Sequence, residues 1–113
     1  MVCADDDAQA AAVAALGPDV IIVEAPDAIA AGAQRTEHTA IAQANSAIWR
    51  VNPDIRVLHG AGINCAQDVY DVIAAGAQGT GSSSAIVNAP DPQGMLEEMI
   101  KAVREAWNAT NRE

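Results

Sequence analysis

The sequence is poor in aromatic residues. It contains no phenylalanine, two tryptophans and one tyrosine among 113 residues, although half of the residues are hydrophobic. The core must therefore be built from small and aliphatic side chains. Alanine is abundant, which favours helices. This composition is typical of a soluble α-rich or α/β protein and excludes a disordered chain.

Basic residues are also scarce. Six Lys and Arg stand against 15 Asp and Glu, which gives a net charge of -9. Nucleic acids and anionic membranes are bound through basic surfaces, so we expect neither as a partner. An anionic ligand would have to be held mainly by backbone N–H groups and helix N-termini.

Cysteine patterns and long apolar runs are missing. Cys3 and Cys65 form no CxxC motif, and a disulfide framework is not expected. No run approaches the roughly 18 apolar residues that a membrane-spanning helix needs. Because the N-terminus shows no secretory pattern, we expect a cytoplasmic location.

Short apolar runs alternate with helical segments along the chain. The runs cover residues 1–3, 20–24, 55–59 and 78–82, and helices are predicted near 8–16, 38–51, 64–76 and 93–110, with a short helical turn at 83–87. The run at 20–24 is continuous and largely β-branched, which is typical of a strand buried in a parallel sheet. We therefore predict an α/β fold of parallel βα units, forming a single domain over residues 1–113.

Local signals support two helix starts. Asp5, Asp6 and Asp7 are favourable N-cap and first-turn residues for the first helix. Asn64 and Gln67 have the spacing of a capping box for the third.

The number of units leaves two architectures open. Four βα units are half of a (β/α)8 barrel, which uses roughly 200–250 residues when complete. A four-stranded open sheet is the alternative, and topology alone does not choose between them.

Glu24 is the first candidate for chemistry. It ends the most apolar strand, and ligands of parallel α/β proteins bind at the C-terminal ends of strands. A carboxylate there is costly unless it has a partner or a role. The alternative is a Glu that simply meets solvent where the strand ends.

Two glycine-rich loops are candidates for binding an anion. Gly60 and Gly62 follow the third strand, and residues 79–85 are Gly, Thr, Ser and Ala only. Such loops present backbone N–H groups to phosphate, although either could equally be a tight turn or a flexible linker. Their succession in the last two units matches the place where barrels bind phosphate.

The histidines and the second cysteine are weaker candidates. His59 ends a strand, but we expect it to be a neutral, hydrogen-bonded structural residue and not an electrophile. His38 starts a helix and is expected to face solvent. Cys65 lies near a helix N-terminus, which can lower the pKa of a thiol, but no base adjoins it in the sequence.

Several motifs together resemble the shorter, archaeal-type triosephosphate isomerases. The resemblance runs through nearly the whole chain and matches the last four βα units of the family in order, so it implies the C-terminal half of a TIM (β/α)8 barrel. The segments that carry it are Val2-Cys3-Ala4-Asp5-Asp6, Ala15-Leu16-Gly17-Pro18-Asp19, Val23-Glu24-Ala25-Pro26-Asp27 and Val57-Leu58-His59-Gly60-Ala61-Gly62-Ile63.

The resemblance implies roles for particular residues. Glu24 matches the carboxylate that moves a proton between two carbons of the triose phosphate, and residues 25–34 match the loop that closes over the substrate. The residues that match the backbone phosphate site are Gly32, Gly60, Gly62, Ser84 and Ala85. The family uses no metal and no organic cofactor, and its reaction belongs to glycolysis and gluconeogenesis.

The resemblance also implies what lies elsewhere. The family's lysine and electrophilic histidine belong to the first four units, so we expect the 113 residues alone to have little or no activity. The expected partners are a small sugar phosphate and either a complementing N-terminal half-barrel or further copies in a homo-oligomer. The polar run at 79–85 and the sequence Ala30-Ala31-Gly32 depart from the family pattern, which leaves a related sugar phosphate open as substrate.

Two other functions remain open. The chain could be a non-catalytic half-barrel that binds phosphate or self-associates by pairing its exposed sheet edges. It could also belong to another phosphate-binding barrel enzyme, because that loop site is shared by many of them.

Overall fold

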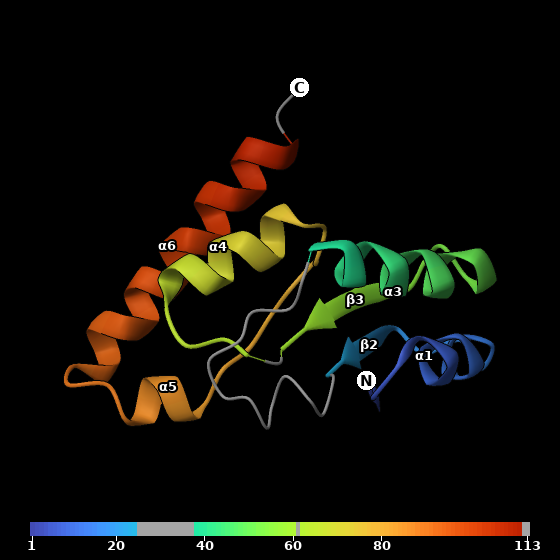
Figure 1. Cartoon of the computed structure of the whole chain (residues 1–113), viewed down its shortest axis with the longest axis horizontal. Coiled ribbons are helices and arrows are strands. Elements are labelled where there is room, and N and C mark those ends of the chain that lie inside the picture. Colours follow the sequence, from blue (N-terminus) through green and yellow to red (C-terminus); the bar gives the residue numbers. More distant parts are fainter. Residues whose placement is uncertain (25–37, 61, 112–113) are drawn as a thin grey trace.

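Strands and helices alternate along the chain in the computed structural model, which describes residues 1–24, 38–60 and 62–111 (Figure 1). The elements are β1 (Val2–Ala4), α1 (Asp7–Ala14), β2 (Val20–Val23), α3 (His38–Val51), β3 (Arg56–His59), α4 (Ala66–Ala74), α5 (Ser84–Val87) and α6 (Pro92–Asn111). The predicted α/β class is confirmed, and the order of the elements agrees with the prediction except that residues 78–82 form no strand.

The strands form one parallel sheet in the order β1-β2-β3. The fourth predicted strand is reduced to a single parallel bridge between Leu58 and Gly79. Around that bridge, the Gln78 N–H donates to the Val57 carbonyl at 2.9 Å, and the His59 N–H donates to the Gly79 carbonyl at 3.1 Å. Glycine has low strand propensity, and Gly79 and Gly81 both lie in this run, which explains why the pairing is so short.

The two faces of the sheet differ in burial. Side chains alternate along a strand, so Ala4, Ile21 and Val57 share one face. All three are at most 1% exposed and pack with residues of α1 and α3. The opposite face carries the paired row Cys3, Ile22 and Leu58, none of which is buried. Among the described residues, the core of this region therefore lies on one face of the sheet.

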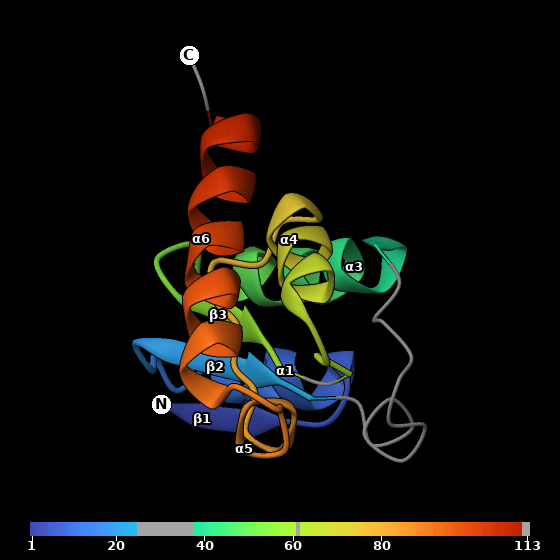
Figure 2. The same ribbon diagram turned by 90° about the vertical axis from the view of Figure 1, so that its left-hand side faces the viewer.

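The helices pack in two groups, of which only α1 and α3 contribute to the core on the covered face. α1 packs against α3, and α4 packs extensively against α6, as the two views of Figures 1 and 2 show. A second core cluster lies between α4 and α6, with Ile41 of α3 included in it. Val69, Val72 and Ile73 of α4 meet Met99 and small residues of α6 there.

One helix start agrees with the sequence and one does not. Asp6 is the N-cap of α1, and its carboxylate accepts from the Gln9 N–H at 2.8 Å, as predicted. The predicted capping box of Asn64 with Gln67 is wrong, because the N-cap of α4 is Cys65. Asp68, the third residue of the helix, accepts from the Asn64 N–H at 2.9 Å and so replaces the expected pair.

Both cysteines are free and exposed, as expected for a chain without a disulfide framework. Among the described helices, none is long and apolar enough to cross a membrane.

A buried polar contact links α3 to β3 and to the end of α4. The Asn45 side-chain amide donates to the Gly76 carbonyl at 3.0 Å, while its oxygen lies 2.9 Å from His59 Nε2. Since an amide oxygen only accepts, the proton of the imidazole must be on Nε2. Asn45 and His59 are 4% and 3% exposed, and burial lowers the pKa of His59 from 6.5 to about 4. His59 is therefore the neutral, hydrogen-bonded residue that we expected.

We expect acid to destabilise the fold through His59. Between about pH 6.5 and pH 4 the unfolded imidazole binds a proton that the folded one does not. The free energy of unfolding should thus fall by about 2 kcal/mol between pH 7 and pH 5, as measured by urea denaturation. His59→Gln should flatten this dependence, and an unchanged slope in that variant would contradict the assignment.

Asn45 should matter more for stability than an exposed asparagine of similar chemistry. Asn45→Ala leaves the buried His59 ring N–H without its partner and removes the part-buried bond to the Gly76 carbonyl, so we expect a loss of about 2 kcal/mol in unfolding free energy. The control is Asn52→Ala, which removes only an exposed turn contact to the Asp54 N–H and should cost less than about 1 kcal/mol. Equal losses in the two variants would argue against the buried link.

Candidate active site

The candidate site lies where β2, β3 and the Gly79 bridge end. Glu24 follows β2 directly, and its N–H donates to the Ala4 carbonyl at 3.0 Å, which continues the sheet by one residue. The strand register places Glu24 beside Gly60, and Gly60 beside Gly81. Glu24 is on the same face as Ile22 and Leu58, because residues two apart share a face. The carboxylate therefore belongs to the face of the sheet that carries no core.

The contact between Glu24 and Gly60 is close. A Cβ atom at Gly60 would lie 3.1 Å from Glu24 Oε1 and 3.8 Å from the Gly81 carbonyl oxygen. The carboxylate thus rests against the Gly60 backbone in space that a side chain would otherwise fill. The sequence predicted Glu24 and Gly60 separately, and the structure brings them together.

The two glycine-rich loops are tied to each other. Ser82 Oγ donates to the Ile63 carbonyl at 3.1 Å, and Thr80 Oγ1 donates to the His59 carbonyl at 2.6 Å. Gly62, at φ +77°, makes the turn that leads into buried Ile63. The loop after β3 and the loop after the Gly79 bridge therefore form one connected rim.

Ser84 and Ala85 open the four-residue helix α5 on this rim. Ser84 is exposed and Ala85 is half-buried. Ser83 is the N-cap of α5, and its hydroxyl makes no capping hydrogen bond to the first turn. Gly32 and the predicted closing loop at 25–34 lie outside the described residues.

The charge around the rim is negative. Asp5 and Asp6 lie in the loop after β1 and are exposed. The described Lys and Arg residues belong to α3, β3 and α6, and none of them is in a loop that follows a strand. Arg56 in particular is the first residue of β3, at the opposite end of that strand from Gly60. Within the described part, the rim offers an anionic ligand backbone dipoles but no Lys or Arg side chain.

The other sequence candidates lie apart from Glu24. His59 is on the covered face of β3 and bonds to Asn45. His38 begins α3 as predicted, and Cys65 caps α4 with an exposed thiol. Among the residues that the structure describes, no three His, Cys, Asp or Glu side chains converge as metal ligands would.

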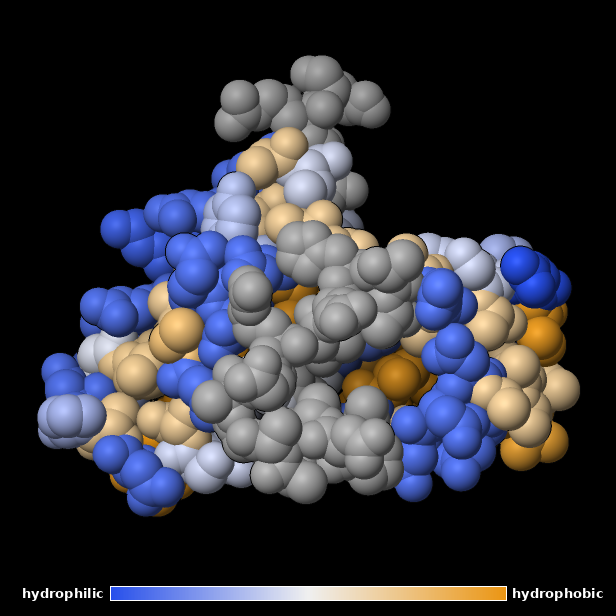
Figure 3. Space-filling model, in the orientation of Figure 1, coloured by the Kyte–Doolittle hydropathy of each residue, from blue (hydrophilic) through white to orange (hydrophobic). Residues whose placement is uncertain are grey.

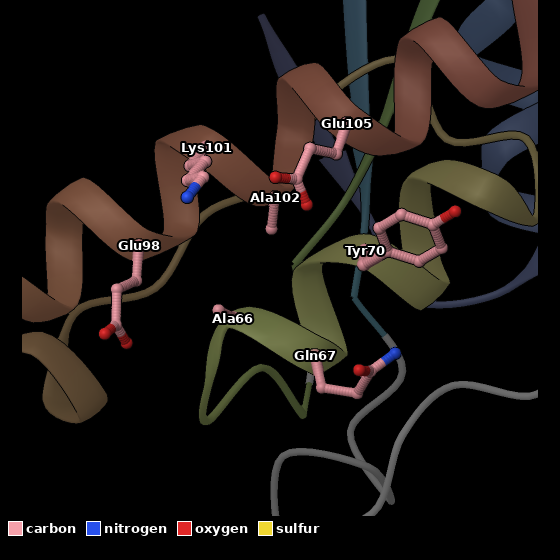
Figure 4. A pocket seen from close by; sticks show the side chains of 7 residues that line it. All are labelled: Ala66, Gln67, Tyr70, Glu98, Lys101, Ala102 and Glu105. Atoms are coloured by element: carbon pink, nitrogen blue, oxygen red, sulfur yellow. The ribbon is translucent and has the colours of Figure 1, made fainter.

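A groove of about 320 Å³ lies between α4 and α6, away from the rim (Figure 4). Gln67 and Tyr70 line it from α4, and Glu98, Lys101 and Glu105 from α6. Two carboxylates flank the lysine along an exposed helix, which is the ordinary pattern of a solvated surface. The groove is therefore a weaker candidate for a catalytic site than the rim.

Sequence reasoning nominated the whole loop at 79–85 but assigned no separate roles to Thr80, Gly81 and Ser82 within it. The signal for Gly81 is its register with Gly60 and Glu24, which depends on strand pairing and cannot be read from propensity. The hydroxyl ties of Thr80 and Ser82 are contacts between loops that lie 19 to 21 residues apart in sequence.

Comparison with known proteins finds similar sequences and structures, although no protein-family model matches the chain. Triosephosphate isomerase from Methanosarcina mazei is 34% identical over 105 residues, which are 91% of this chain and 47% of that protein. The enzymes from Methanothermobacter thermautotrophicus and Caldivirga maquilingensis are 36% and 37% identical, and the chain covers 46% of each.

Solved structures are likewise matched over somewhat less than half of their length. A chain of the BexX/CysO complex of Amycolatopsis orientalis superposes with a TM-score of 0.76 at 26% identity, over 98% of this chain and 42% of that one. The 3-hexulose-6-phosphate synthase of Salmonella typhimurium gives a TM-score of 0.66 at 26% identity, over 94% and 48%. These neighbours are TIM-barrel-type proteins, and the chain spans about half the length of the proteins that it matches. Over that half, this chain is a homologue of the archaeal triosephosphate isomerases.

Proposed function

We propose that this chain supplies the general base and the phosphate-binding loops of a triosephosphate isomerase-like site. The site would interconvert dihydroxyacetone phosphate and glyceraldehyde 3-phosphate, or act on a related short sugar phosphate. The observation that carries the proposal is the position of Glu24, whose carboxylate lies against Gly60 at the strand ends. Homology to enzymes named triosephosphate isomerase supports the reaction class.

Glu24 is the residue we assign to proton transfer. Its carboxylate takes a proton from the carbon next to the substrate carbonyl and returns it to the carbonyl carbon, while the hydroxyl proton on the first carbon passes to the former carbonyl oxygen. The isomerisation therefore needs no external oxidant or reductant. Gly60 lets the carboxylate lie close to the backbone at this place, and a group within hydrogen-bonding reach of the transferred proton is what general base catalysis requires.

Backbone groups are the phosphate ligands in this proposal. Gly60, Gly62, Ser84 and Ala85 lie on the connected rim, and resemblance to the family adds Gly32. The acidic composition leaves few side chains for this task, whereas the first amides of α5 have no side-chain cap. Oriented backbone N–H groups bind phosphate without a fixed positive charge.

The negative charge of the intermediate needs a further donor. Proton removal places charge on the substrate oxygens, and preorganised donors or cations normally stabilise it. The described part of the rim carries no Lys or Arg, so we infer that these groups come from the part of the barrel that the chain does not match. The chain alone should accordingly show little or no isomerase activity.

Replacing the base should abolish turnover in a completed barrel. We propose a chimera in which this chain replaces the matched segment of the Methanosarcina mazei enzyme. Glu24→Gln keeps the size of the side chain but removes its basicity, and kcat should fall by about 10²–10⁴-fold. A coupled assay for glyceraldehyde 3-phosphate measures this effect. An inactive parent chimera that folds, or an active Gln variant, would refute the proposed function.

Gly60 should tolerate a methyl group poorly, unlike its neighbour Gly81. The Cβ of Gly60→Ala would stand 3.1 Å from Glu24 Oε1, while nothing lies within 4 Å of a Cβ at Gly81. Shifting the carboxylate should lower kcat by about 10²-fold in the same chimera, because a small misplacement of a catalytic group is costly. Gly81→Ala is the matched control and should stay within about threefold. Equal effects would show that Gly60 does not position Glu24.

A further inference from the structure

We propose that Thr80 and Ser82 are positioning residues of the site, because their hydroxyls hold the two glycine-rich loops at a fixed spacing. This inference rests on the proposed function, since it concerns the backbone that would bind the substrate phosphate. It assigns the spacing of that backbone to two side chains that need not touch the substrate. Binding and turnover measured on the same variants distinguish the inference from the proposed function.

Thr80 replaces the next backbone hydrogen bond of the sheet. In a parallel pair, a residue donates its N–H to one residue of the neighbouring strand and accepts at its carbonyl from the residue two positions further on. The His59 N–H donates to the Gly79 carbonyl at 3.1 Å, so a continued strand would bring the Gly81 N–H to the His59 carbonyl. The Thr80 hydroxyl donates to that carbonyl instead, at 2.6 Å. The backbone pairing therefore ends at Gly79, and a side chain continues the contact.

Gln78 shows the same kind of replacement on the other side of the Gly79 bridge. Its side-chain oxygen accepts from the Val57 N–H at 2.9 Å, which a backbone carbonyl would do in a longer strand. The Gln78 contact lies towards the start of β3, whereas the Thr80 contact lies at the end of β3, beside Gly60. Of the two, Thr80 is therefore the one that bears on the site.

Ser82 adds a second contact between the loops. Its hydroxyl donates to the carbonyl of Ile63, a residue that is only 6% exposed, at 3.1 Å. Thr80 bonds to the residue immediately before Gly60, and Ser82 bonds to the residue immediately after Gly62. The two hydroxyls thus hold both ends of one glycine-rich segment against the next. Because the proposed phosphate ligands stand in both loops, their spacing depends on these two bonds.

Burial does little to fix this part of the chain. None of the residues 79–84 is buried, and α5 contains no buried residue. Ala85 and Ile86 pack partly against the cluster between α4 and α6, but they follow the two contacts. Figure 3 shows hydrophilic and hydrophobic residues interspersed over the described surface of one side of the molecule. Hydrogen bonds therefore contribute more than burial to the position of residues 80–83.

Loss of either hydroxyl should weaken the binding of the phosphate group and leave proton transfer largely intact. Glu24 is held separately, by its own N–H to the Ala4 carbonyl. In the chimera described above, Thr80→Val and Ser82→Ala should raise KM about tenfold and keep kcat within about threefold. Thr80→Ser restores the hydroxyl and should return KM to within about twofold of the parent. A role in stability alone would lower the amount of folded enzyme without changing KM.

Binding of 2-phosphoglycolate to the chimera, measured by calorimetry, tests the inference without turnover. Kd should rise about tenfold in Thr80→Val and Ser82→Ala and recover in Thr80→Ser. Thr110→Val is the matched control, because it removes a hydroxyl that donates to the Ala106 carbonyl of its own helix, and it should leave Kd unchanged. Circular dichroism checks that each variant folds, and Ser82→Ala provides the test if Thr80→Val does not fold.

These binding ratios would support the inference even in a chimera without isomerase activity, which would count against the proposed function alone. Unchanged Kd and KM in the folded variants of an active chimera would overturn the inference and leave the proposed function standing. Equal weakening by Thr80→Ser and Thr80→Val would overturn it, because the hydroxyl would not be the cause. A folded chimera that binds no 2-phosphoglycolate would overturn it as well, since there would be no phosphate site to position.

The contact itself can be measured in the 113-residue chain alone. The His59 N–H donates to the Gly79 carbonyl beside the Thr80 contact, so its hydrogen exchange should become about tenfold faster in Thr80→Val. The Glu24 N–H, which donates to the Ala4 carbonyl, serves as the internal reference and should exchange at the parental rate. An unchanged ratio of the two exchange rates would show that Thr80 does not hold the loop.

Discussion

One-sided burial of the parallel sheet is the constraint on which the rest of this structure depends. α1 and α3 cover the face that carries Ala4, Ile21 and Val57, and the opposite row of Cys3, Ile22 and Leu58 has no described core. Glu24 continues that second row. A carboxylate on the fully packed face would have to be desolvated, which is costly, whereas this one stands on the face that a barrel turns towards its mouth. The feature that leaves this face without a described core also leaves Glu24 outside the described core.

A buried polar link keeps the rim in place from the other side of the sheet. Asn45 joins α3 to the turn at Gly76 and to His59, the residue that immediately precedes Gly60. The hydroxyl of Thr80, which lies on the neighbouring loop, donates a further hydrogen bond to the His59 carbonyl. His59, the residue before Gly60, is therefore held by hydrogen bonds both through its ring and through its carbonyl oxygen. A histidine at a strand end can thus serve a site without touching its ligand.

Much of the fold could be predicted from the sequence, and the failures have physical reasons. The apolar run at 20–24 and the helix at 38–51 were clear, because their patterns are continuous and periodic. The fourth strand was not clear, because Gly79 has little strand propensity of its own and pairs with Leu58 only where the register of the sheet brings it. The capping box failed because Asp68, one residue beyond Gln67, reaches the Asn64 N–H instead. Glu24 and Gly60 could each be nominated, but their contact depends on strand pairing across 36 residues.

The acidic residues near the rim determine whether added salt favours or opposes the binding of an anionic ligand. Asp5, Asp6 and Asp7 lie beside the strand ends, and the ligand that we propose is itself an anion. Long-range repulsion from a chain of net charge -9 slows the approach of such a ligand, and mobile ions screen that repulsion. Backbone dipoles act only at contact distance, where screening is weak. For the surface that this half contributes, added salt should therefore raise the rate of ligand association and change the stability of the bound complex little. A phosphate site lined by lysines would show the opposite response, because salt would screen its attraction for the ligand.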